Sequence, residues 1–202
     1  MGKIEENKQL KKQKLMDTAF ALFTSKGIVR TSVADIVESS GLAKGTFYLY
    51  FRDKYDLQEK LIIRESEKLF RHALKNSDYR QCEAAEDKVL AITGDILDQM
   101  EKDRRLLGFI NKNLSWGIFR TALSRADSEI LAFFEEILHI SDAQQLEILV
   151  YTIVELVSAT CYSVILDSDP VDLQHYKPVL FRIIRGILRD FREDSGNGAT
   201  SC

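Results

Sequence analysis

The sequence predicts an all-α protein of about nine helices. Only 2 prolines and 10 glycines occur in 202 residues, which leaves little room for the many tight turns of an all-β fold. Apolar side chains recur every three or four residues along most of the chain, and no segment shows the alternation of a strand or an internal repeat. The content of 45% hydrophobic and 29% charged residues is ordinary for a globular protein.

The first helix is predicted from about Lys8 to Lys26. Its apolar residues fall at positions i, i+3, i+4 and i+7, which places them on one helical face: Met16, Ala19, Phe20 and Phe23. Gly27 follows directly and can take the backbone conformation that ends a helix.

Two short helices follow. Thr31 or Ser32 would cap the first of them, and Asp35, three residues after Ser32, completes an approximate capping box. Gly41 breaks that helix, and the next is predicted from about 44 to 51. Phe47 and Phe51, at i and i+4, must point inward.

Asp53 can cap a fourth helix that begins at Lys54. Its inward positions are Leu57, Leu61, Leu69 and Ala73. Beyond residue 80 the helical period continues through Val89, Thr93, Ile96, Leu97 and Met100. Breaks are predicted near Asn113–Gly117 and Ser124–Asp127.

The last two helices are predicted to be long. Ser141 with Gln144 forms a capping box for an apolar helix that ends at about Asp167. Pro170 suits the start of the final helix, from about 171 to 192, which carries the cleanest amphipathic stripe in the chain. Residues 195–202 are expected to form a disordered polar tail.

The apolar segment Ile148–Leu166 approaches the length that spans a membrane. Glu155 near its centre would cost about 2.5–3.5 kcal/mol on insertion, so we expect a helix buried in protein and no membrane partner. The polar segment Met1–Lys14 lacks the apolar core of a signal peptide. Three widely spaced cysteines fit a reducing compartment. We therefore expect a cytoplasmic protein.

Charge divides unevenly along the chain. The net charge is −3, but residues 1–60 carry 11 Lys and Arg against 8 Asp and Glu, a net of +3, and the remainder carries −6. A basic segment could face an anion while the acidic part stays solvated. The bias is mild, and chance is the alternative explanation.

The helices predicted at 31–51 form a helix-turn-helix pattern, in which the second helix enters the major groove of DNA. With Phe47 and Phe51 inward, the residues left facing outward are Lys44, Gly45, Thr46, Tyr48 and Tyr50. Tyrosines beside a lysine suit a sugar–phosphate wall, where the ring packs and the hydroxyl donates to a phosphate. Gly45 would permit close approach of the backbone, and Lys54 adds a cation near a helix terminus, where anions bind.

The segment Thr31–Leu57, TSVADIVESSGLAKGTFYLYFRDKYDL, resembles the DNA-binding region of the TetR family of bacterial transcriptional regulators. The matching positions are Thr31 or Ser32, Ile36, Gly41, Gly45, Phe47, Tyr48, Phe51, Lys54 and Leu57. Ala43 departs from the family pattern, which has a capping Ser there, and Tyr50 replaces a common His. The lost cap would cost ~1 kcal/mol locally.

The resemblance implies a head at residues 1–60 that binds DNA and a body at residues 61–194 that binds a ligand and dimerises. The implied DNA-binding residues are Thr31, Ser32, Lys44, Gly45, Thr46, Tyr48, Leu49, Tyr50 and Lys54. Helices 141–167 and 171–192 would pair with their copies in a homodimer, so the operator would be an inverted repeat. The family's usual mode is repression relieved by a small molecule.

An apolar or aromatic effector is expected in the body. The candidate pocket residues are Met100, Phe109, Trp116, Phe119, Phe133, Phe134, Tyr151, Glu155 and Tyr162. Aromatic residues at helical spacing are also what a plain core contains. Glu155 could hold a cationic ligand or pair with Arg or Tyr across the dimer interface.

The sequence shows no catalytic or metal-binding motif. His72, His139 and His175 lack neighbours at metal-ligand spacing, and the P-loop, H-E-x-x-H and G-x-S-x-G patterns are absent. We therefore expect no enzyme activity, cofactor or metal. The alternative function is that of an all-α protein that binds a protein partner and uses its helix-turn-helix only structurally. The outward residues Lys44, Gly45, Thr46, Tyr48 and Tyr50 distinguish the two, because a purely structural unit would carry Glu, Gln or Ala there.

Overall fold

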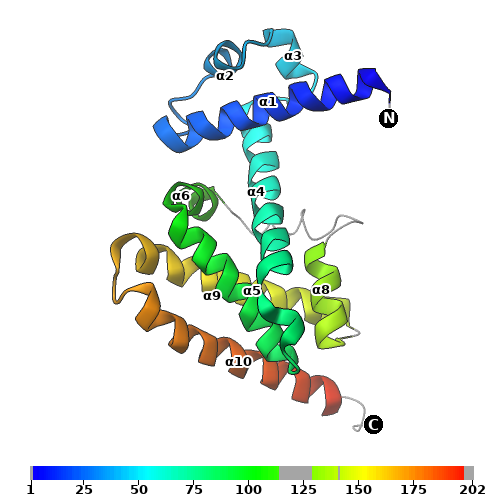
Figure 1. The fold of residues 1–202 in the computed structure, drawn as a ribbon, viewed down its shortest axis with the longest axis vertical. Helices are drawn as coiled ribbons and strands as arrows, with labels where there is room; N and C mark the ends of the chain where they lie inside the picture. Colours follow the sequence, from blue (N-terminus) through cyan, green and yellow to red (C-terminus); the bar gives the residue numbers. More distant parts are fainter. Residues whose placement is uncertain (1, 114–128, 141, 198–202) are drawn as a thin grey trace.

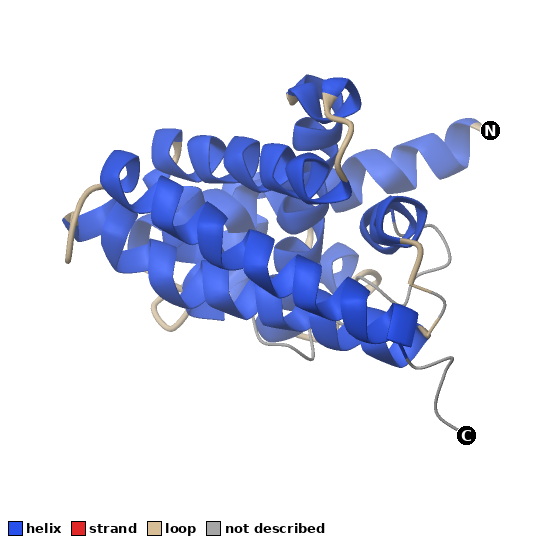
Figure 2. Ribbon diagram, turned by 90° about the horizontal axis from the view of Figure 1, so that it is seen from below, coloured by secondary structure: helices blue, strands red, loops and turns tan. Residues whose placement is uncertain are grey.

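The computed structural model describes residues 2–113, 129–140 and 142–197. Those ranges contain nine α-helices, one short 3₁₀ helix and no strand, as Figures 1 and 2 show. The all-α prediction is therefore confirmed. The breaks predicted within 114–128 lie outside the described residues, as does Ser141.

Three helices build most of the head: α1 at Lys3–Lys26, α2 at Val33–Ser40 and α3 at Lys44–Tyr48. Helix α1 begins five residues before the predicted start, and its first turns project beyond the rest of the head (Figure 1). Periodicity missed that extension because its side chains are solvated and carry no apolar stripe. Helix α3 ends at Tyr48 rather than at residue 51.

Helix α4, Lys54–Asn76, runs from the head into the body (Figure 1). The Asp53 side chain accepts hydrogen bonds from the backbone N–H groups of Tyr55 and Asp56, both at 2.8 Å, and so caps the helix as predicted. The predicted inward residues Leu57, Leu61, Leu69 and Ala73 are all buried. The predicted boundary at residue 60 lies inside this continuous helix.

The body contains five further described helices. They are α5 at Ala85–Lys102, α6 at Arg104–Asn113, α8 at Glu129–Leu138, α9 at Ala143–Asp167 and α10 at Leu173–Asn197, with the 3₁₀ turn η1 at Asp78–Gln81 before them. Helix α9 packs against α5, α6, α8 and α10. It is also long and apolar enough, by length and composition alone, to cross a membrane.

Two predicted helix starts are wrong by one to three residues. Asp142, not Ser141, caps α9, since its carboxylate accepts from the N–H groups of Gln144 and Gln145 at 2.8 and 3.2 Å. Helix α10 begins at Leu173 rather than near Pro170. The carboxylate of Asp172, directly before Leu173, accepts from the N–H of His175 at 3.0 Å. It continues to Asn197, into the segment expected to be a disordered tail.

Buried apolar residues form two clusters. One fills the body, and its members include Cys161, whose thiol pKa is raised to about 11 by burial. The other fills the head but also contains Phe109 and Ile110 from α6. The Phe109 ring lies edge-on to Phe20 at 5.3 Å and stacks with Phe23 at 6.5 Å, so α6 joins the head to the body.

Candidate nucleic-acid interface

The turn before α2 is built from a complete capping box. The Ser32 hydroxyl oxygen accepts from the Asp35 N–H at 3.1 Å, and the Asp35 carboxylate accepts from the Ser32 N–H at 2.7 Å. Ser32 is therefore the cap rather than Thr31. The hydrogen bond from the Ser32 backbone, with Lys26 at 3.0 Å, lowers the pKa of Asp35 to about 2. The cap thus stays ionised at neutral pH.

Gly41 ends α2 in the left-handed conformation, with φ 63°, where a side chain would be strained. Its N–H donates to carbonyls of the last turn of α2, which closes the helix before α3 begins. Ala43 precedes α3 and provides no side-chain cap, as the sequence predicted. The first turn of α3 consequently presents N–H groups without a capping oxygen from Ala43.

The outward surface of α3 matches the prediction at most positions. Lys44 and Gly45 are exposed, while Tyr48 is 52% and Leu49 78% exposed. Thr46 is half-buried. Phe47 and Phe51 are buried at 0% and 2% exposure, so the helix is anchored on one side and open on the other. A Cβ added at Gly45 would have no neighbour within 4 Å.

Three predicted contact residues are engaged inside the head. Thr31 is fully buried, and its hydroxyl donates to the Gly27 carbonyl at 2.8 Å. The Lys54 ammonium donates to the carbonyls of residues 28, 29 and 31 at 2.9, 3.2 and 2.9 Å, which uses all three of its protons. Tyr50 is half-buried against the head core. The prediction that Thr31 and Lys54 face DNA through their side chains is therefore corrected, because both hold the α1–α2 turn.

Residues 15–61 match the family model for bacterial regulatory proteins of the tetR family. The HTH-type transcriptional regulator YvdT of Bacillus subtilis is 39% identical over 64 residues, which is 32% of this chain and 31% of YvdT. The HTH-type transcriptional regulator AcrR of Shigella flexneri is 34% identical over 55 residues, or 27% of this chain and 26% of AcrR. These matches support a transcriptional regulator of the TetR family.

These curated relatives match over about a third of their own length or less. Solved structures extend the likeness in fold to the rest of the chain. A TetR-family regulator from Shewanella sp. PV-4 has a TM-score of 0.68 at 20% identity, covering 87% of this chain and 96% of that one. The regulator FadR of Bacillus subtilis, solved with stearoyl-CoA, has a TM-score of 0.62 at 16% identity, covering 85% and 96%.

The TetR-type head also carries candidate contacts that sequence reasoning missed. The projecting first half of α1 holds exposed lysines: Lys3, Lys8, Lys11 and Lys14 among them. Lys14 ends close to the turn at Gly41, because a Cβ added there would lie 4.0 Å from the Lys14 Nζ. The lysine-rich run before Leu15 is the sequence signal for these contacts.

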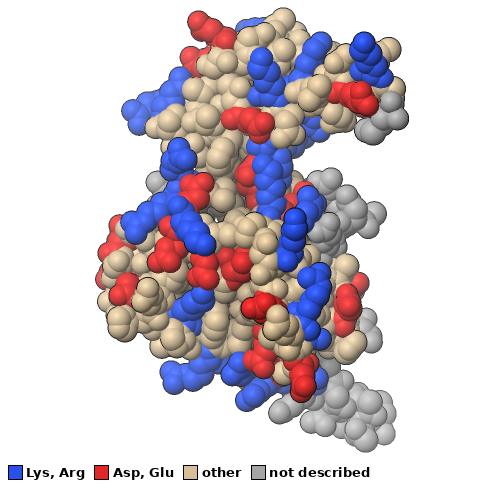
Figure 3. All heavy atoms as spheres, in the orientation of Figure 1, with Lys and Arg blue, Asp and Glu red and all other residues tan. Residues whose placement is uncertain are grey.

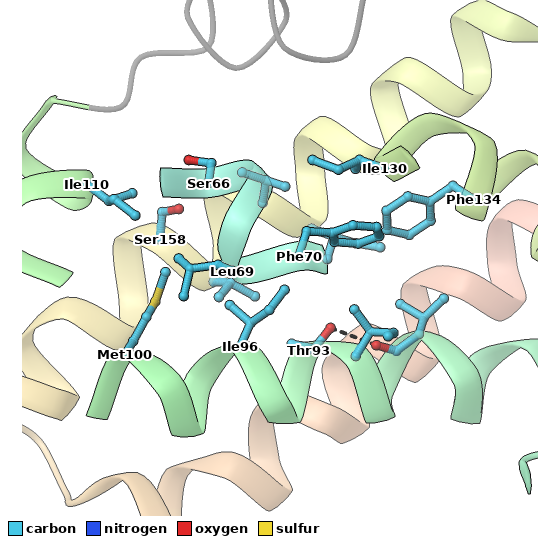
Figure 4. A pocket seen from close by; sticks show the side chains of 15 residues that line it. Ser66, Leu69, Phe70, Thr93, Ile96, Met100, Ile110, Ile130, Phe134 and Ser158 are labelled. Atoms are coloured by element: carbon cyan, nitrogen blue, oxygen red, sulfur yellow. Dashed lines mark hydrogen bonds between the residues drawn. The ribbon is translucent and has the colours of Figure 1, made fainter. Parts of the chain in front are cut away.

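The body contains an apolar cavity of about 120 Å³. Helices α4, α5, α6, α8 and α9 line it with twelve apolar residues and the hydroxyl residues Ser66, Thr93 and Ser158. Figure 4 shows Ser66 and Ser158 at the end where Ile110 lies, with Phe134 toward the other. The buried Ser66 oxygen has no hydrogen-bond partner within the described ranges.

The predicted pocket residues are only partly brought together. Met100 and Phe134 line the cavity, and Phe133 packs beside it against Phe134, with ring centroids 5.4 Å apart. Phe109 belongs to the head core instead. Trp116 and Phe119 lie outside the described residues.

Three further predicted residues do not line the cavity: Tyr151, Glu155 and Tyr162. The residues of α9 that do line it are Ile153, Val154, Val157 and Ser158. The prediction is therefore corrected for Tyr151 and Glu155, whereas Tyr162 lines a different hollow, at the junction of head and body. The sequence analysis did not predict that residues of α4, among them Ser66 and Phe70, line the cavity, because a helical period does not show what an inward face meets. Within the described part of the chain, no group of three or more His, Cys, Asp or Glu residues could hold a metal.

Proposed function

We propose that this chain is a ligand-responsive DNA-binding repressor that acts as a homodimer on an inverted-repeat operator in the bacterial cytoplasm. The open face of α3 is the observation that carries the proposal. The exposed residues on α3 and directly after it are Lys44, Tyr48 and Leu49, while Phe47 on the opposite side of the helix is buried in the head core. An exposed tyrosine and leucine beside a lysine are costly to leave in water, but they suit a groove wall.

In this role the first residues of α3 enter the major groove. Lys44 and Thr46 reach base edges or phosphates, and the Tyr48 ring packs against a sugar while its hydroxyl donates to a phosphate. Gly45 lets the backbone approach closely, since no part of the described chain occupies the space beside it. The Ser32 hydroxyl, already accepting from Asp35, keeps its proton free to donate to a phosphate at the start of α2.

The dimer would form through α9 and α10, which pack side by side. Ile148 and Tyr151 on α9 are 47% and 41% exposed, and Val179 and Ile183 on α10 are 41% and 42% exposed. On each helix the two residues are three or four positions apart and therefore share a face. Exposed apolar residues on two adjacent helices are typical of an interface between copies. Glu155, on the same face of α9, would pair with a basic or tyrosine side chain across the interface.

The effector would occupy the apolar cavity of the body. An apolar cavity of about 150 Å³ in another protein holds benzene, so the present 120 Å³ accepts a ligand of roughly that size without rearrangement. No Asp, Glu, Lys or Arg is found among its described lining residues, so the buried part of the ligand is uncharged. The unpartnered Ser66 hydroxyl supplies one polar handle.

Helix α4 would carry the response from the cavity to the head. Ser66, Leu69 and Phe70 line the cavity, while Leu57 and Leu61, three turns earlier, are fully buried in the head core. A ligand that displaces the cavity end of α4 therefore also turns the head, which changes the spacing of the two recognition helices in a dimer. This spacing must match one DNA turn, about 34–36 Å.

The test is binding to a DNA duplex from the region upstream of the protein's own gene, followed by fluorescence anisotropy between 50 and 200 mM salt. A dimer that contacts about 6–10 phosphates should lose on the order of 10³–10⁵ in affinity over that range. Lys44→Ala and Tyr48→Phe should each weaken binding about tenfold, whereas Lys75→Ala, an exposed lysine at the far end of α4, should not. Salt-insensitive binding, or full affinity in both α3 variants, would refute the assignment.

A further inference from the structure

A second hollow lies at the junction of head and body. It is a cleft of about 550 Å³ lined by the end of α1 and the following loop, by the first half of α6, and by Tyr162 and Leu166 near the end of α9. This volume lies within the 300–1,000 Å³ typical of small-molecule sites. The cleft is distinct from the apolar cavity, because the two share no lining residue.

The cleft is lined by cations from both sides of the junction. Lys26 and Arg30 come from the head, and Arg104 and Arg105 from the start of α6. Among the described lining residues there is no Asp or Glu. This concentration is unexpected in a chain whose net charge is −3 and whose body is acidic. Figure 3 shows Lys and Arg side chains on both head and body at the left of the junction.

Neighbouring carboxylates neutralise only part of this charge. The Lys26 ammonium lies 3.0 Å from Asp35, and the Arg105 Nε lies 3.9 Å from the Asp103 carboxylate. Asp103 is itself used as a cap, accepting from the N–H groups of Arg105 and of residue 106. The Arg105 side chain remains 80% exposed, and Arg104 makes one long hydrogen bond of 3.4 Å to the Leu166 carbonyl. Arg30, Arg104 and Arg105 can therefore turn toward a ligand.

We propose that this cleft is a binding site for a phosphorylated small molecule that carries a ring or short apolar group. Guanidinium groups bind phosphate oxygens in a bidentate fashion, which favours a phosphate over a halide or a single carboxylate. The floor of the cleft is apolar, formed by Phe23, Ile28 and Phe109, and it would cover the rest of the ligand. Tyr162 offers both a ring face and a hydroxyl.

The position of the cleft separates it from the surface assigned to DNA. Helix α1 lies between the pair α2 and α3 on one side and α6 on the other (Figure 1). Arg104 and Arg105 are thus on the far side of α1 from the open face of α3. A small anion fits this cleft between head and body better than a duplex does.

A ligand here would also fix the head against the body. Arg30 moves with the head and Arg104 with α6, so one phosphate bound by both acts as a bridge between them. Helix α6 also reaches the other hollow, where Ile110 lines the apolar cavity. Given the proposed function, the cleft ligand and DNA should alter each other's affinity by the same factor.

Calorimetric titration of the full chain with ADP, pyrophosphate and adenosine at 150 mM salt tests the site without DNA. We expect saturable binding of ADP, weaker binding of pyrophosphate and none of adenosine. The double variant Arg104→Gln/Arg105→Gln should bind ADP at least tenfold more weakly. The charge-matched control Lys75→Gln/Lys102→Gln, exposed residues outside the cleft, should bind ADP as the wild type does.

Absence of saturable ADP and pyrophosphate binding would overturn the proposal, as would equal ADP affinity in the double variant. If that variant loses affinity for the duplex when no anion is present, the arginines contact DNA and the proposal also fails. A chain that binds ADP through these arginines but binds no DNA would support the site and refute the proposed function. The anion site and the proposed DNA-binding function can therefore be refuted independently of each other.

Discussion

Replacing Gly45 by Ala should stabilise the protein and weaken its binding to DNA. A Cβ at this position meets nothing within 4 Å, and the residue lies inside α3 without a positive φ. Alanine is favoured over glycine in a helix by about 0.5–1 kcal/mol. In a chain of this size each kcal/mol shifts the Tm by about 2–4 °C, so the variant should melt about 1–4 °C higher.

The added methyl group would occupy the space that the proposed complex gives to DNA. Displacement of the backbone from the groove should weaken operator binding at least tenfold, which corresponds to about 1.4 kcal/mol. The assays are thermal unfolding at fixed protein concentration and fluorescence anisotropy with the upstream duplex. If Gly45→Ala binds the duplex as tightly as the wild type, α3 does not approach DNA at this residue.

Gly41→Ala provides a matched control in the same turn. Gly41 has a φ of 63°, where an alanine is strained by about 1–2 kcal/mol, and its added Cβ has only the Lys14 Nζ nearby, at 4.0 Å. This variant should therefore melt at a lower temperature and keep most of its DNA affinity below the transition. If Gly45→Ala raises the Tm and Gly41→Ala lowers it, the backbone conformation at each glycine, and not the added methyl group itself, decides the change in stability.

Two further predictions concern assembly and acid stability. Ile183→Glu should weaken dimerisation more than 100-fold in sedimentation equilibrium, because an unpaired charge in an apolar interface costs about 3–5 kcal/mol. The same change at Ile4 on α1, which is 76% exposed against 42% for Ile183, should leave dimerisation unchanged. An Ile183→Glu dimer of wild-type affinity would exclude this face. Because the pKa of Asp35 is lowered to about 2 in the folded state from 3.8, its ionised cap stabilises the fold fully above about pH 4 and is lost as the pH falls through 2. The difference in Tm between wild type and Asp35→Asn should thus shrink from pH 4 to pH 2, and a constant difference would show that the charge is not what matters.

The head could be predicted largely from sequence because its signals are local. The capping box of Ser32 and Asp35, the break at Gly41 and the inward pair Phe47 and Phe51 each lie within a few residues, and all are present in the structure. The missing cap at Ala43 was predicted for the same reason. Boundaries were less accurate where solvated residues continue a helix without an apolar stripe, as in the first turns of α1.

The side-chain partners across elements could not be predicted in this way. Thr31 and Lys54 match a DNA-binding pattern, yet both bind carbonyl groups of the α1–α2 turn. Tyr151 and Phe109 were both predicted to line the ligand pocket of the body, but the Tyr151 side chain is exposed on α9, and the Phe109 ring packs against Phe20 of α1 at the edge of the other hollow. The helical period of a sequence shows which residues share one face of a helix. It does not show which other helix packs against that face.

The sequence by itself determined the all-α class, the helix-turn-helix and the family, since these depend on spacing and capping within short segments. Only the tertiary structure decided which residues surround the apolar cavity, and it alone placed Lys26 and Arg30 opposite Arg104 and Arg105 across a cleft. Residues more than 70 positions apart meet there because α4 carries the chain out of the head and α6 returns to pack against α1. Contacts of that kind follow from how helices cross, which no local pattern records.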